Sequence, residues 1–136
     1  MKLTPTLTIM SLLSILLLTF HLTGDTLHAK FGTPEAGGST LVAVPILVVW
    51  LYGTLMLAGR RSGYVIVLIG SLLGLLIPVI HVMGAGGVFH GQLAKSEGDF
   101  LFVWTLHALG VTALLSLILS TIGLLNPHRA GANPVS

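Results

Sequence analysis

The fold is decided by residues 62–94, which read SGYVIVLIGSLLGLLIPVIHVMGAGGVFHGQLA and contain no Asp, Glu, Lys or Arg. Three further stretches are equally free of these residues: 3–24, 36–59 and 100–128. Each is longer than the roughly 20 residues that a helix needs to cross about 30 Å of hydrocarbon. Because backbone groups in lipid must be paired within the chain, such long apolar runs indicate helices.

The composition supports the same fold class. Of the 136 residues, 54% are hydrophobic and 7% are charged, whereas an ordinary soluble domain carries roughly 25% charged residues. We therefore predict an all-α membrane protein that forms one domain, residues 1–136, with four transmembrane helices in an antiparallel bundle. The expected spans are approximately 4–23, 40–59, 63–83 and 101–125. The expected location is a bacterial cytoplasmic membrane, crossed several times.

The charged residues predict the orientation of the bundle. Four of the six basic residues occur at the N-terminus, in the second connection and at the C-terminus: Lys2, Arg60, Arg61 and Arg129. The other two, Lys30 and Lys95, occur in the first and third connections. All four acidic residues occur in the first and third connections: Asp25, Glu35, Glu97 and Asp99. Cytoplasmic segments are enriched in Lys and Arg, so both termini are predicted to be cytoplasmic.

Small residues and prolines indicate how the predicted helices pack. Gly70 and Gly74 form a small-xxx-small pair, which lets helix backbones approach closely in lipid. A second row repeats every four residues: Ala108, Thr112, Ser116 and Ser120. Pro45 and Pro78 are expected to bend their spans.

The aromatic residues near the predicted span ends allow two interpretations. Trp50, Tyr52 and Tyr64 fit either the aromatic belt at the membrane boundary or the bundle core. Tyr64, beside Arg61, is the best candidate for the belt.

Histidine is the chemical signal in this chain, because five of the six histidines fall in or beside the outer half of the membrane. His21 follows Lys2 by 19 residues and His81 follows Arg61 by 20. At about 1.5 Å per residue, both lie at nearly the same height. His107 follows Asp99 by eight residues, which places it about 12 Å inward from the outer boundary.

The first span carries a polar stripe at alternating spacings of three and four residues: Ser11, Ser14, Leu18, His21, Asp25 and His28. This spacing keeps its members on one helix face. Polar groups are costly against lipid, so the stripe is predicted to face the other helices. Asp25 and His28 belong to this face only if the helix continues past Gly24.

These residues suggest a bound cofactor. Neutral imidazole ligates zinc, copper and haem iron, and a nearby carboxylate fixes the tautomer. The candidate ligands of haem b are His21, His81 and His107, and the candidate set for copper or zinc adds Asp25 and His28. Two histidines on facing helices of a four-helix arrangement resemble small cytochrome b membrane modules, although no family motif matches residue by residue.

Three alternatives remain open. One is a divalent-ion site nearer the surface that draws on loop residues such as His90 and Glu97. Another is a proton relay, or a site for a polar headgroup or a quinone, built from His21, Asp25 and His107. The third is an accessory or structural subunit without a cofactor, which packs its small-residue faces against other membrane subunits or a second copy.

Several function classes lack their signature. The chain has no cysteine, hence no thiolate metal site and no C-x-x-C-H haem attachment. It has no P-loop, no H-E-x-x-H and no G-x-S-x-G. The scattered basic residues form no nucleic-acid footprint. No catalytic motif argues for an enzyme, and a redox or electron-transfer role stays open.

Overall fold

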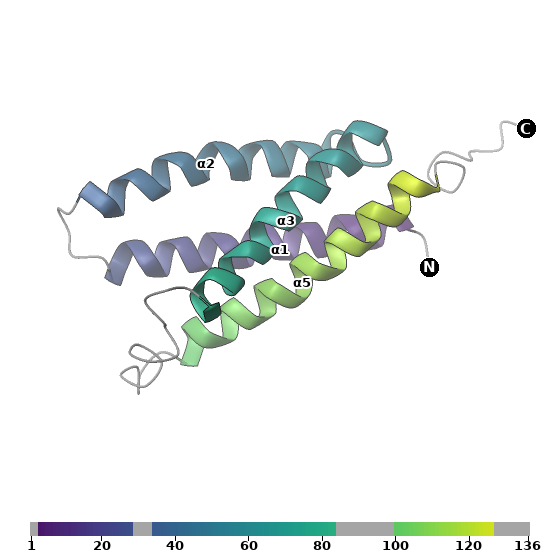
Figure 1. Ribbon diagram of the computed structural model, residues 1–136. Helices are drawn as coiled ribbons and strands as arrows, with labels where there is room; N and C mark the ends of the chain where they lie inside the picture. Colours follow the sequence, from purple (N-terminus) through teal and green to yellow (C-terminus); the bar gives the residue numbers. More distant parts are fainter. Residues whose placement is uncertain (1–2, 29–33, 84–99, 127–136) are drawn as a thin grey trace, which may run out of the picture.

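The computed structural model of the chain describes residues 3–28, 34–83 and 100–126, with side chains for 3–23, 42–79 and 103–126. Within these ranges the protein is all-helical and has no strand (Figure 1). The helices are α1 (Leu3–His28), α2 (Pro34–Leu55), α3 (Arg61–Met83) and α5 (Phe100–Leu125).

The helices extend into the predicted first connection. We expected a loop from about residue 23 to 40, but α1 continues past Gly24 to His28, and α2 already begins at Pro34. One glycine inside a helix costs only about 1 kcal/mol. A proline at the first helical position loses no helix hydrogen bond. Gly24 therefore did not mark a helix end.

Three helices are long and apolar enough to cross a membrane: Leu3–Thr23, Arg61–Val79 and Val103–Leu125. In α2, the apolar stretch with described side chains is shorter, Val42–Leu55. Many large apolar side chains lie on the outside of the helices, for example Ile9, Ile69 and Val111. Such a surface is suited to contact with lipid.

The helices pack most extensively in the pairs α3–α5 and α1–α5, while α2 packs on α1 and α3 (Figure 1). At one end of the molecule, the Tyr64 ring of α3 lies where a Cβ atom on Gly123 of α5 would be. Its hydroxyl lies 3.4 Å from Oγ1 of Thr4 in α1. We call this end, where Thr4, Tyr64 and Gly123 meet, the Tyr64 end. We call the opposite end, toward His21 and His107, the histidine end.

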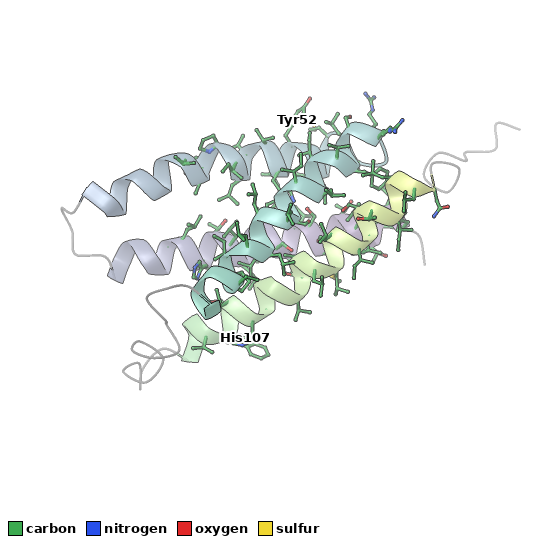
Figure 2. All side chains as sticks on the ribbon, viewed as in Figure 1. Tyr52 and His107 are labelled. Carbon is green, nitrogen blue, oxygen red and sulfur yellow. The ribbon has the colours of Figure 1, made fainter. Side chains whose placement is uncertain are left out.

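The aromatic residues divide between core and surface. Tyr64, the best candidate for the membrane boundary, is instead a core residue that is 3% exposed. Trp50 is also buried, whereas Tyr52 is 54% exposed. Figure 2 shows Tyr52 pointing away from the bundle on α2.

Gly70 and Gly74 make room for a ring rather than for a helix backbone. A Cβ atom on Gly70 would overlap the Trp50 indole, and one on Gly74 would lie 3.0 Å from Cη2 of the same ring. The indole of α2 thus fills the groove along α3. This glycine face is therefore used for packing within the chain.

In α5, the buried face follows spacings of three and four residues rather than the predicted row of every fourth residue. Leu109, Ala113, Ser116 and Ser120 are buried, whereas Thr112 is only half-buried. Pro78, inside the continuous helix α3, packs against this helix, since a Cβ atom on Gly110 would lie 3.5 Å from its Cγ.

A tight turn joins α2 to α3. Gly59 has a φ of 77°, in the left-handed region that glycine adopts without strain. The Arg60 amide donates to the Leu57 carbonyl at 3.0 Å, and the Tyr64 amide donates to the Arg60 carbonyl at 3.1 Å. The turn therefore delivers Tyr64 directly into the core.

Candidate functional site

The polar stripe of α1 faces inward, as predicted. Ser11, Ser14, Leu18 and His21 are each at most 7% exposed. His21 is the buried histidine among the side chains that the structure describes, at 2% exposure. Its imidazole therefore lies inside the bundle, near the histidine end.

The extension of α1 carries the same face further. Asp25 and His28 follow His21 at spacings of four and three residues, and all three positions lie in one continuous helix. The side chains of Asp25 and His28 lie outside the described ones.

His81 lies in α3 at a position that corresponds to His21. His21 follows Thr4 by 17 residues, and His81 follows Tyr64 by the same number. Since the Thr4 and Tyr64 hydroxyls approach to 3.4 Å, the two histidine positions lie at similar heights on α1 and α3. The side chain of His81 lies outside the described ones, and His90 and His128 lie outside the described residues altogether.

His107 occupies different surroundings from His21. It is exposed, on the outer surface of α5, and Figure 2 shows its ring projecting from the side of the bundle. We expected both histidines to serve one site. The structure instead places one ring inside the bundle and the other outside it, and no contact joins them within the described residues.

The hydrogen bond of His107 fixes the state of its ring. Nδ1 lies 2.8 Å from the carbonyl oxygen of Val103, one turn earlier in α5. A carbonyl oxygen only accepts, so Nδ1 carries the proton and donates it. In the neutral ring Nε2 is then the atom with the free electron pair. Metal-ligating histidines commonly donate their other N–H to a backbone carbonyl in this way.

An apolar groove of about 310 Å³ runs beside His107 between α3 and α5. It is lined by Leu75, Pro78, Val79, Leu106, His107, Gly110, Val111 and Leu114. His107 is the one polar side chain in this lining. Gly110 widens the groove because it has no side chain. The groove thus combines an apolar wall with a single nitrogen ligand.

No group of three or more His, Asp or Glu side chains that could hold a metal ion occurs among the described residues. The predicted copper or zinc set of His21, Asp25, His28, His81 and His107 is not tested by this result, because three of its side chains are not described. It stays a prediction.

A buried hydrogen-bond ring between α1 and α2 was not foreseen. The Trp50 indole N–H donates to Ser11 Oγ at 2.9 Å, and the Thr54 hydroxyl donates to the Trp50 carbonyl at 2.8 Å. The Ser11 and Thr54 hydroxyls lie 2.7 Å apart. Since the Thr54 proton is already used, Ser11 donates to Thr54. The spacing of four residues from Trp50 to Thr54 was a signal for one of the three hydrogen bonds only.

Comparison of the chain with protein-family models, with curated proteins and with solved structures found no match. The function is therefore argued from the geometry of the described residues.

Proposed function

We propose that this chain is a multi-pass membrane protein that binds haem b, with Nε2 of His107 as an axial ligand in the groove between α3 and α5. The observation that carries the proposal is the 2.8 Å contact between Nδ1 of His107 and the Val103 carbonyl. Because Nδ1 donates this bond, Nε2 is the ring atom that could bind iron, and His107 lines an apolar groove. A haem presents a large apolar ring, and its iron takes a histidine ligand.

The geometry favours a haem over a single metal ion at His107. A zinc or copper ion typically takes three or four protein ligands, and the groove supplies one. Haem iron needs only one or two, since the porphyrin provides the other four. His107 lies seven residues after the start of α5, about 10 Å along the helix, so a haem held there would lie near the histidine end.

The proposed topology has four antiparallel spans with both termini in the cytoplasm. The contacts at the Tyr64 end support it, because they bring the start of α1, the start of α3 and the end of α5 together. Arg60 immediately precedes α3, Arg61 is its first residue, and Lys2 immediately precedes α1. Clustered basic residues are typical of the cytoplasmic side.

A ligand pair inside the bundle is the other arrangement within this proposal. His21 and His81, at similar heights on α1 and α3, would ligate the iron from two helices, as in four-helix haem proteins. The burial of His21 supports this pair, whereas the ring orientation of His107 supports the groove. Single-histidine variants distinguish the two.

The test is an absorption spectrum of the purified protein, oxidised and dithionite-reduced, with metal analysis on the same sample. We expect a Soret band and sharp reduced α and β bands in the wild type. His107→Ala should lose them, and His128→Ala, beyond the last helix, should keep them. If His21→Ala loses these bands and His107→Ala keeps them, the ligand is His21 inside the bundle. A colourless, metal-free wild type would contradict haem and ion binding alike.

An accessory role is a second candidate, supported by a second apolar groove of about 310 Å³. It lies between α2 and α3 and is lined by Pro45, Ile46, Val49, Trp50, Ile66, Ile69, Gly70 and Leu73. A partner helix would place an apolar side chain there. An accessory subunit should be purified with a partner and should lose it when Ile69 is replaced by Arg, whereas a haem protein should retain its spectrum in that variant.

A further inference from the structure

Two buried hydroxyl groups stand out from the other polar side chains of the core. Ser71 of α3 and Ser116 of α5 are each 0% exposed. Neither Oγ atom has a hydrogen-bond partner in the part of the chain that the structure describes. By contrast, the buried hydroxyls of Ser14 and Ser120 donate to carbonyls of their own helices. A hydroxyl that is buried without a partner is unfavourable, so such groups call for an explanation.

The register of α3 against α5 sets the two hydroxyls at one level. A Cβ atom on Gly74 would lie 3.6 Å from Cβ of Ala113, which fixes one contact between these helices. Ser71 precedes Gly74 by three residues, and Ser116 follows Ala113 by three. At the Tyr64 end the next contact, Tyr64 on Gly123, gives the same register. Ser71 and Ser116 therefore lie between the Gly74–Ala113 contact and the Tyr64–Gly123 contact. They are about one helical turn from the Gly74–Ala113 contact.

The same level contains the hydrogen-bond ring between α1 and α2. The Trp50 indole donates to Ser11, and its ring atoms contact Gly70 and Gly74, on either side of Ser71. Ser11 also follows Thr4 by the seven residues that separate Ser71 from Tyr64. All four helices thus contribute a hydroxyl to one level: Ser11, Thr54, Ser71 and Ser116.

The chemistry of this level selects a small neutral ligand. The described side chains there carry no charge, and a bare cation inside an apolar bundle would be expensive. Each hydroxyl offers one proton and two electron pairs. Ser11 and Thr54 have used their protons within the ring but each keeps a free electron pair. A water molecule matches this set, because it accepts two hydrogen bonds and donates two.

We propose that a water molecule is bound in the middle of the bundle between the hydroxyls of Ser71 and Ser116, beside the Ser11–Thr54–Trp50 ring. It accepts a hydrogen bond from each serine and donates to the free electron pairs of the ring. Buried waters of this kind typically make about three hydrogen bonds to groups that would otherwise be unpaired. His21 follows Ser11 by ten residues, about 15 Å along the helix, so this site is independent of the proposed haem ligands.

Solid-state NMR of the wild-type protein in lipid bilayers tests the proposal through magnetisation transfer from water. We expect strong transfer to Ser71 and Ser116 and weak transfer to Ser120, whose buried hydroxyl donates to the Leu117 carbonyl. The wild-type measurement does not depend on whether any variant folds.

Alanine variants test whether the two serines share the water. Ser71→Ala should abolish most of the transfer to Ser116, and Ser116→Ala should do the same to Ser71, whereas Ser120→Ala should leave both signals unchanged. The proposal is wrong if magnetisation transfer from water to Ser71 and Ser116 is as weak as to Ser120 in the wild type. It is also wrong if removal of either serine leaves the transfer to the other serine at its wild-type level.

Discussion

The Tyr64 end and the histidine end of the bundle are built on different principles. Near the Tyr64 end, large rings fill the space left by glycines: Trp50 lies on Gly70 and Gly74, and Tyr64 on Gly123. Toward the histidine end, one imidazole points inward from α1 and another outward from α5. Ring-on-glycine packing fixes the first region, and the second region carries the two described histidines.

The difference predicts how substitutions in the two regions affect stability. Tight packing against glycine tolerates little change, since a single added methyl group meets a ring. An outward-facing histidine contributes little to packing and is free to serve a ligand. Substitutions in the two regions should therefore have opposite effects on stability and on ligand binding.

The largest effect is expected for Gly70→Ala. Its Cβ atom would overlap the Trp50 indole, and we expect a loss of about 3 kcal/mol in the free energy of unfolding. Unfolding by SDS titration, followed by tryptophan fluorescence, measures it. Gly110→Ala is the matched control, because its Cβ atom would make an ordinary 3.5 Å contact with Pro78. Equal stability of the two variants would contradict the ring-on-glycine packing.

A somewhat smaller effect is expected at the histidine end for His21→Ala. Removal of a ring that is 2% exposed leaves a cavity in the bundle, at an expected loss of about 2 kcal/mol. His107→Ala should change the free energy of unfolding by no more than about 0.5 kcal/mol, because that ring is exposed. The same SDS titration compares them. If His107→Ala proves the more destabilising, the inward and outward assignments are reversed.

The hydrogen-bond ring predicts a loss of about 1.5 kcal/mol for Ser11→Ala, since the buried Trp50 indole N–H loses its acceptor. Ser14→Ala is the matched control: it is equally buried but donates only to the Met10 carbonyl in its own helix. Its removal should cost clearly less. A red-edge shift of Trp50 fluorescence in a Trp104→Phe background reports the change around the indole directly. The absence of any difference between the two serine variants would speak against the ring.

The smallest effect is expected in the turn between α2 and α3. Gly59→Ala forces a side chain into a φ of 77°, at a cost of about 1 kcal/mol. Gly59→Asn should lose less, because asparagine tolerates the left-handed region better than alanine. Thermal unfolding in detergent ranks the two variants. A higher unfolding temperature for alanine than for asparagine would show that the turn is not held in this conformation.

Much of the fold was predictable because long apolar stretches are a strong signal for helices. The four described helices and the inward face of Ser11, Ser14 and His21 were expected from sequence. Polar residues at helical spacing have one favourable side, the protein interior, so α1 was easy to orient. The end of α1 was not, since Gly24 is compatible with both a helix and a break.

The orientation of the other helices was harder to predict, because they lack a polar stripe like the one on α1. In α5 both the lipid-facing and the core-facing positions are apolar, as Val111 outside and Leu109 inside show. A periodic pattern that separates inside from outside is therefore weak. His107 alone does not make such a pattern, so it does not show which face of α5 is inside. The core position of Trp50 depended on glycines in a different helix, a relation that no local spacing reveals.

The pairing of α1 with α5 has a consequence for biosynthesis. At about 5–20 residues per second, a ribosome needs on the order of ten seconds between Thr4 and Gly123, which meet the same Tyr64 ring. During that interval α1 lacks the helix against which it packs most extensively. A chain that stops before α5 therefore leaves Ser11, Ser14 and His21 without that neighbour.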